Sequence, residues 1–176
     1  MRELALAAEL YGTATQVYFN YKTEQLTADD IANMKAAASA VSIPAVCDEI
    51  TSGQLPDGIS KRTRTVLFEA DNSLRQYFYF DTANLSKYTF MLNGNVVTPT
   101  QNTTGDAYYV EQTNIASGLL SREYTFSVSD GVNTFQTRSS ALSYAYNRQE
   151  NSPSPDMVNL SKLLYRYSQA AEAYFN

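Results

Sequence analysis

The sequence predicts an α+β fold in which an antiparallel β-sandwich is flanked by helices from both ends of the chain. Apolar residues recur at helical spacing near both ends, they alternate with a period of two in between, and Asn-Gly and Asp-Gly turns interrupt the alternating part. The expected units are N-terminal helices with a connector, the sandwich, and a C-terminal helix, over residues 1–61, 62–146 and 147–176. We expect the terminal helices to pack together against the sandwich, so that all three form one structural unit.

The first of these segments predicts two helices. Over residues 2–20, apolar side chains recur at steps of three and four, which return to one helical face. Thr27 and Asp30 approximate a capping box, so a second helix is expected over residues 28–40, before Pro44. The following residues, 44–61, are rich in proline and glycine and predict an irregular connector.

The central segment predicts seven short strands at a spacing of about ten residues, which indicates an antiparallel sandwich of immunoglobulin-like size. Asn93-Gly94 and Asp130-Gly131 predict hairpins, because a type I′ turn needs positive φ. Asp71-Asn72 predicts a further turn, and residues 141–146 predict a helical segment that leaves the sheet. The strands are expected at residues 65–69, 74–80, 88–92, 96–98, 107–111, 124–128 and 134–137.

The last segment predicts a break over residues 147–156 and then a helix to residue 175. Ser154 is placed as the N-cap, with Pro155 at the first helical position and an acidic residue in the first turn. The apolar stripe of this helix repeats that of the first helix at an offset of 156 residues, as from Tyr11 to Tyr167, and both helices end in Tyr-Phe-Asn. The shared pattern predicts that the two helices pack against each other, or lie side by side on one face of the sandwich.

Composition excludes several classes of function. The 176 residues include no His and one Cys, so a Ser-His-Asp triad, a Cys-His dyad, an imidazole zinc site and an internal disulfide are all ruled out. With 13 basic and 18 acidic side chains the formal net charge is −5, which disfavours nucleic acid as a partner. No apolar run reaches the ~20 residues of a membrane span, so no membrane insertion is expected.

Three stretches are similar to a known module. The ending Leu-Tyr-x-Tyr-x-x-Ala-Ala-x-Ala-Tyr-Phe at residues 164–175, the opening at residues 10–21 and the stretch at residues 140–146 carry the same tyrosine and alanine signature. They resemble an uncharacterised helix-flanked β-sandwich module that recurs in large secreted and cell-surface proteins of Gram-positive gut bacteria. The resemblance implies an extracellular, multidomain setting with flanking domains as partners, and it supplies no catalytic or binding residues.

The sequence therefore favours a non-catalytic structural or interaction module, without cofactor or metal, that positions domains or contributes to adhesion. The alternative is a carbohydrate-binding module. Along residues 74–80, alternate side chains point to opposite faces, so phenylalanines facing the core leave tyrosines outward, where flat rings suit stacking on sugars. The competing expectation is that the terminal helices cover this face. Polysaccharide or another surface protein is the expected ligand, and the candidate residues are Tyr77, Tyr79, Tyr108 and Tyr109.

Acidic residues suggest further chemistry, although Asp at strand ends is also typical of turns. Glycoside hydrolysis needs only two opposed carboxylates, and calcium needs oxygen ligands from neighbouring loops. A Lys–Asn isopeptide bond, with Lys61, Asn133 and Glu69, is a third idea. The acids considered for hydrolysis are Glu69, Asp71, Asp81, Asp106 and Glu111, and the oxygen ligands considered for calcium are Asp71, Asn72, Asp81 and Asn84. For all of these, solvated turns are the preferred interpretation.

Overall fold

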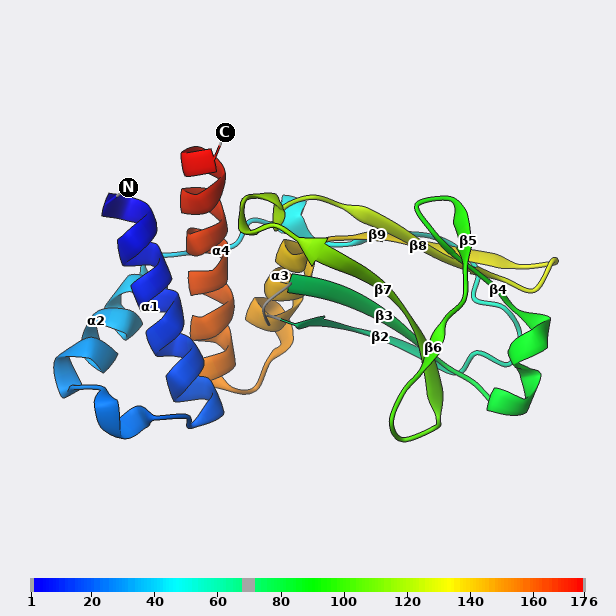
Figure 1. The fold of residues 1–176 in the computed structure, drawn as a ribbon, viewed down its shortest axis with the longest axis horizontal. Helices are drawn as coiled ribbons and strands as arrows, with labels where there is room; N and C mark the ends of the chain where they lie inside the picture. Colours follow the sequence, from blue (N-terminus) through cyan, green and yellow to red (C-terminus); the bar gives the residue numbers. More distant parts are fainter. Residues whose placement is uncertain (1, 68–71, 176) are drawn as a thin grey trace. The chain divides into compact units, whose positions relative to one another are not determined.

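The structure is a computed structural model that describes residues 2–67 and 72–175 of the chain. Along the chain, helices lie near both termini and strands lie between them, so the fold is α+β, as the sequence predicts (Figure 1). The α-helices are α1 (Arg2–Phe19), α2 (Ala28–Ser39), α3 (Ala141–Asn151) and α4 (Pro155–Phe175). Short 3-10 helices are η1 (Thr23–Gln25), η2 (Ala45–Cys47), η3 (Thr82–Lys87) and η4 (Ser117–Leu119).

The chain divides into two compact units, which we call the helical unit and the β unit. The helical unit comprises Met1–Asp48, Ser117–Ser121 and Ala145–Asn176, and the β unit comprises Glu49–Ala116 and Arg122–Tyr144. The expectation that the terminal helices lie against the sheets stays a prediction.

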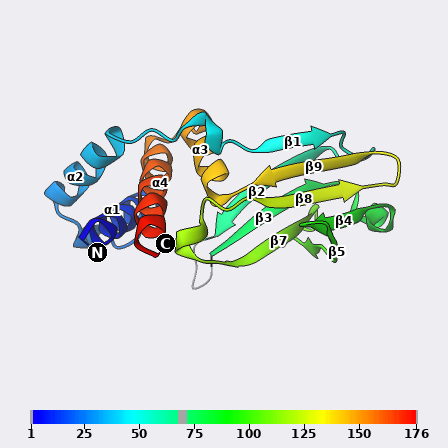
Figure 2. The ribbon, with the colours of Figure 1, turned by 90° about the horizontal axis from the view of Figure 1, so that it is seen from above.

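In the helical unit, α1 and α4 lie side by side and run in opposite directions, so that the start of α1 and the end of α4 lie together (Figures 1 and 2). The apolar stripes of α1, α2 and α4 meet in one buried cluster, because each stripe returns to the same face of its helix. The pairing of the terminal helices is therefore confirmed. The cluster consists of Leu10, Ala14, Met34, Ala38 and Leu163.

Two predicted helix starts are confirmed by their caps. At α2, the Thr27 hydroxyl accepts from the Asp30 N–H at 3.1 Å, and the Asp30 carboxylate accepts from the Thr27 N–H at 2.8 Å. At α4, the Ser154 hydroxyl accepts from the Met157 N–H at 3.3 Å. These bonds satisfy N–H groups that a helix leaves unpaired at its first turn.

The break expected over residues 147–156 is wrong in its first half, because α3 continues to Asn151. The physical reason is a long-range contact that the sequence pattern does not reveal. The Gln149 side-chain amide accepts from the Ile43 N–H at 2.8 Å and donates to the Ile43 carbonyl at 3.2 Å. Gln149 thereby satisfies the backbone of an irregular segment, which helps to hold the last turn of α3 in helical form.

The β unit consists of two antiparallel sheets. The larger sheet has five strands in the order β1-β9-β8-β4-β5, and the smaller sheet has four in the order β2-β3-β7-β6. The larger sheet contains β1 (Ile50–Gly53), β4 (Thr89–Leu92), β5 (Asn95–Val97), β8 (Tyr124–Ser129) and β9 (Thr134–Ser139). The smaller sheet contains β2 (Lys61–Leu67), β3 (Asn72–Tyr79), β6 (Thr100–Gln101) and β7 (Ala107–Ile115).

Two strands correct the sequence-based expectation. Strand β1 lies within residues 44–61, which predict an irregular connector, and the two-residue β6 was not expected. Both are edge strands with exposed side chains, so neither carries the apolar alternation by which buried strands are identified. Part of the first expected strand, residues 68–69, lies outside the described residues. So does Asp71 of the turn expected at Asp71-Asn72, while Asn72 already belongs to β3.

Aromatic side chains from the two sheets face each other within the β unit. The ring centroids of Phe78 on β3 and Phe90 on β4 are 5.7 Å apart, and those of Phe80 and Phe90 are 6.1 Å apart. Phe78, Phe80 and Phe90 are all buried. The alternation predicted for residues 74–80 is therefore confirmed for the phenylalanines, which supply the core of the unit.

Both predicted hairpins are present, but their turns differ. Asn93 and Gly94 have φ values of 51° and 81°, which is the conformation a type I′ turn requires. In the β8–β9 hairpin only Gly131, with φ of 88°, is in this region among the turn residues. There the Asp130 carboxylate accepts from the N–H groups of Val132 at 2.9 Å and Asn133 at 2.7 Å, so a side chain closes a longer loop.

Candidate functional site

The strongest sequence-based candidate lies on the outer face of the smaller sheet, which we call the tyrosine face. It comprises Arg75, Tyr77 and Tyr79 of β3 with Tyr109 and Glu111 of β7. The register places Tyr77 opposite Tyr109 and Arg75 opposite Glu111. Directly paired residues of an antiparallel pair point to the same face, so these side chains form neighbouring rows. All five are half-buried.

The two central tyrosines contact each other across the strands. Ring centroids of Tyr77 and Tyr109 are 5.0 Å apart, and the ring planes are inclined by 43°. The Arg75 guanidinium lies over the Tyr109 ring, 4.6 Å from its centroid. Tyr109 is therefore packed between an aromatic neighbour and a cation.

Polar contacts hold Arg75 in this position. Its Nε donates to the Glu111 carboxylate at 2.9 Å, and the Ser73 hydroxyl donates to the same oxygen at 2.6 Å. Burial works to lower the pKa of Arg75, but the hydrogen bond and charge of Glu111 outweigh it and raise that pKa. Arg75 and Glu111 neutralise each other, so this pair adds no net charge to the tyrosine face.

The other two candidates differ in position. Tyr79 lies on the tyrosine face, where the Lys61 ammonium is 5.2 Å from its ring centroid. Tyr108 lies on the inner side of the sheet instead, because it is offset by one residue from Tyr109. Its ring stacks on that of the buried Phe80, with centroids 5.6 Å apart and planes inclined by 17°. The structure thus brings Tyr77, Tyr79 and Tyr109 together and separates Tyr108 from them.

The described acidic candidates have local hydrogen-bonding partners. Asp106 accepts from Asn102 at 2.7 Å and from Thr104 at 2.5 Å, and these bonds lower the pKa of Asp106. Asp81 accepts from the Ala83 N–H at 3.1 Å and caps η3. Glu69 and Asp71 lie outside the described residues. Residues 2–67 and 72–175 contain no group of three or more acidic or thiol side chains that could hold a metal ion.

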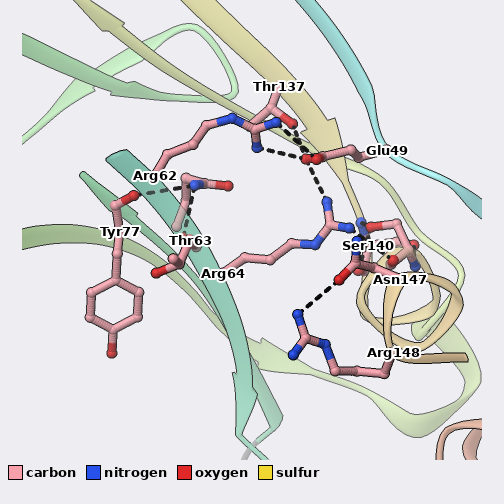
Figure 3. Close-up of polar contacts among 11 residues, drawn as sticks. Glu49, Arg62, Thr63, Arg64, Tyr77, Thr137, Ser140, Asn147 and Arg148 are labelled. Carbon is pink, nitrogen blue, oxygen red and sulfur yellow. Dashed lines mark hydrogen bonds and ion pairs between the residues drawn. The ribbon is translucent and has the colours of Figure 1, made fainter. Parts of the chain in front are cut away.

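A second polar site, missed by the sequence reasoning, lies inside the β unit (Figure 3). We call it the Glu49 cluster, and it comprises Glu49, Arg62, Arg64 and Thr137. Arg62 donates to both Glu49 oxygens, at 3.0 and 2.9 Å, and the Thr137 hydroxyl donates to Glu49 at 2.9 Å. Arg64 forms an ion pair with Glu49 and donates to the Ser143 carbonyl at 3.0 Å.

Strand geometry explains why these charges lie inside. β2 is an edge strand of the smaller sheet, and Arg62 and Arg64 occupy alternate positions on its inner side, opposite Phe78 and Gln76. The Arg64 side chain is only 8% exposed. Inward-pointing charges are a recognised way to protect an edge strand from pairing with another chain. In the sequence, the alternate positions of the two arginines were the signal for one face of a strand. A search for alternating apolar residues does not detect this signal, because arginine is polar.

The chemistry of the Glu49 cluster is that of a structural ion pair. Burial alone would raise the pKa of Glu49, but the hydrogen bond and charge of Arg62, together with Arg64 and Thr137, hold that pKa below its usual value. A carboxylate with a lowered pKa stays ionised near neutral pH and is a poor general acid or base there. The arrangement therefore joins the two sheets across the β2 edge.

No protein-family model, no curated protein and no solved structure matches this chain. Separately, none of the described helices is both long enough and apolar enough to cross a membrane.

Proposed function

We propose that this chain is a non-catalytic structural and interaction module of a larger extracellular or cell-surface protein. The observation that carries the proposal is the pairing of α1 with α4, in which Tyr11 and Tyr167 stack with centroids 5.7 Å apart. The first and last helices of the chain thereby belong to one packed unit. Helices transmit orientation where a flexible linker does not, so flanking domains joined to them would be held in defined directions.

The absence of a role in catalysis is part of this proposal and has chemical support. Asp81, Asp106 and Glu111, the described acids considered for hydrolysis, accept hydrogen bonds that turns or neighbouring strands supply. Glu49 is half-buried and held ionised between two guanidinium groups. Acid–base catalysis by two carboxylates requires environments that separate their pKa values. The carboxylates named above take part in structural contacts instead.

The finer fold assignment belongs to the same proposal. We infer that the β unit is an immunoglobulin-like sandwich, an architecture common in cell-surface domains. Its support is the pair of antiparallel sheets and the contact of Phe78 with Phe90 between them. Such a unit presents two outer faces and several loops for contact with another surface protein.

Scattering measurements on the full-length parent protein test domain positioning. The wild type is expected to show fixed distances between the domains on either side of this module. The double variant Tyr11→Ala/Tyr167→Ala is expected to broaden those distances, because it removes the stacked pair, whereas Tyr21→Ala, at a residue 59% exposed, is not. A wild-type protein that behaves as freely jointed domains would contradict the proposal.

A second candidate function is carbohydrate binding at the tyrosine face, and the Tyr77–Tyr109 ring pair favours it. Aromatic rings with hydroxyl groups suit both stacking on a sugar ring and hydrogen bonding to it. The Arg75 guanidinium already lies over Tyr109, so a ligand must share or displace that contact. Polysaccharide binding is expected to fall for Tyr77→Ala and Tyr109→Ala but not for Tyr21→Ala, as measured by calorimetry. Failure of a broad polysaccharide panel to bind would end this candidate.

A further inference from the structure

The outer face of the larger sheet carries a hollow that the sequence reasoning did not consider. We call it the polar hollow; its volume is about 350 Å³. Strands β1, β9 and β8 line it side by side, because Ile50 pairs with Arg138 and Arg138 pairs with Thr125 in the sheet. Its lining residues are Ile50, Ser52, Thr125, Gln136 and Arg138. The volume is at the lower end of the range for small-molecule sites, about 300–1,000 Å³.

The hydrogen-bonding groups of the polar hollow are available to a ligand. No described residue forms a hydrogen bond with the side chains of Ser52, Thr125 or Gln136. Ser52 and Gln136 are exposed and Thr125 is half-buried. Two hydroxyls and a primary amide together offer both donors and acceptors. On the tyrosine face, by contrast, Ser73 and Arg75 already bond to Glu111.

The walls of the polar hollow add an apolar surface and a cation that is paired with a carboxylate. The Ile50 side chain is large, apolar and 51% exposed. Arg138 Nε bonds to Glu123 at 3.0 Å, so its guanidinium is held by a carboxylate that also balances its charge. A ligand in the polar hollow therefore meets two hydroxyls, one primary amide, one apolar side chain and no unbalanced charge.

We propose that the polar hollow binds a neutral sugar ring. Sugar hydroxyls both donate and accept, which matches Ser52, Thr125 and Gln136, and the C–H face of the ring suits contact with Ile50. A balanced Glu123–Arg138 pair gives no electrostatic preference for an acidic glycan. An apolar or aromatic anchor of a peptide is less well matched, since such anchors fill desolvated pockets and the polar hollow offers one apolar side chain. This inference uses residues apart from the tyrosine face, so neither site depends on the other.

Calorimetric titration of the whole chain with neutral hexasaccharides (cello-, xylo-, manno- and maltohexaose) tests the proposal. At least one is expected to bind, and Gln136→Ala is expected to weaken binding about fivefold or more, the effect of losing one or two hydrogen bonds. The matched control is Thr134→Ala, which alters an exposed residue on the same face of β9 outside the polar hollow. Its affinity should stay within about twofold of the wild type.

Each contrary outcome has a distinct meaning. Binding that survives Gln136→Ala but is lost in Tyr77→Ala would overturn the polar hollow and support the tyrosine face. Binding of oligogalacturonate without any neutral hexasaccharide would overturn the assignment to a neutral sugar. No binding by the entire panel would overturn both carbohydrate sites while leaving the domain-positioning proposal intact. Because Gln136 is exposed, an unchanged melting temperature is expected for its variant and excludes misfolding as the cause.

Discussion

Tyr11 and Tyr167 stack on each other with their ring planes inclined by only 10°. They occupy equivalent positions in the pattern that α1 and α4 share. Two antiparallel helices that share one sequence pattern can be related by a local two-fold axis, as in a self-complementary interface. Equivalent residues of the two helices contact each other only where that axis passes between them. The helix ends also correspond: Tyr18 with Phe19, and Tyr174 with Phe175, form edge-to-face pairs with centroids 4.8 and 5.1 Å apart. The repeated sequence thus has a packing explanation.

Replacing the stacked tyrosines is expected to destabilise the helical unit. Tyr11→Ala and Tyr167→Ala should each lower the free energy of unfolding by about 2–4 kcal/mol, since each removes a large ring from a packed position. The double variant should lose about 1 kcal/mol less than the two single variants lose together. Each single variant already loses the whole stacking energy of the ring pair, so adding their losses counts that energy twice. Urea denaturation of the four proteins gives this coupling energy. A strictly additive double variant would show that the rings do not stabilise each other.

Tyr11 also predicts a loss of stability at alkaline pH. Burial raises the pKa of Tyr11 above its ordinary value of 10.0, with a smaller contribution from Tyr167, while a hydrogen bond with Thr15 works against this. Above pH 10 the unfolded chain therefore loses a proton that the folded chain keeps, so folding stability falls as pH rises. Burial also raises the pKa of Tyr88, Tyr124 and Tyr165. Ultraviolet titration should therefore show one more late-ionising tyrosine in the wild type than in Tyr11→Phe, and that tyrosine is Tyr11. Its ionisation at an ordinary pH would contradict the burial argument.

Glu49→Gln is expected to destabilise the β unit by about 2–4 kcal/mol, because it leaves two inward-pointing guanidinium groups without a carboxylate. The matched control is Glu123→Gln, which breaks the exposed pair with Arg138 and should cost less than about 1 kcal/mol. Thermal and urea unfolding measure both changes. Equal effects of the two substitutions would mean that burial of the Glu49 cluster adds nothing to its strength.

From Glu49 we also expect the folding stability to fall in acid. The folded-state pKa of Glu49 lies below its ordinary value of 4.5, so in mildly acidic solution the unfolded chain binds the proton first. The contribution of Glu49 is present above that ordinary value and is lost as pH falls through the folded-state pKa. Stability measured from pH 7 down to pH 3 should therefore decline more steeply for the wild type than for Glu49→Gln. Parallel curves for the two proteins would refute this assignment.

Gly53, at the end of β1, is expected to tolerate no side chain. Its φ is +76°, and a Cβ there would overlap the carbonyl oxygen of Thr134 on the neighbouring strand. Gly53→Ala should cost about 2–4 kcal/mol, since strain adds to a clash with backbone. Gly131→Ala is the control, because its φ is +88° and nothing lies within 4 Å of its added Cβ. Only about 1 kcal/mol is expected there, from the strained φ alone.

The local parts of the fold could be predicted from sequence because short-range patterns encode them. The helix starts at Thr27 and Ser154, the Asn93-Gly94 turn and the inward phenylalanines each depend on residues within a few positions of one another. Most strands of the β unit were found in the same way, since burial of one sheet face forces a period of two. The tyrosine pair on β3 followed from that alternation.

What only the tertiary structure decided depends on residues distant in the chain. The choice of Tyr109 rather than Tyr108 needed the register of β7, since a shift of one residue reverses the face of every side chain. The extension of α3 needed Ile43, and the Glu49 cluster needed Arg62 and Arg64 to meet a carboxylate from before β1. The polar hollow requires three strands in register, a juxtaposition that no single segment of the sequence contains.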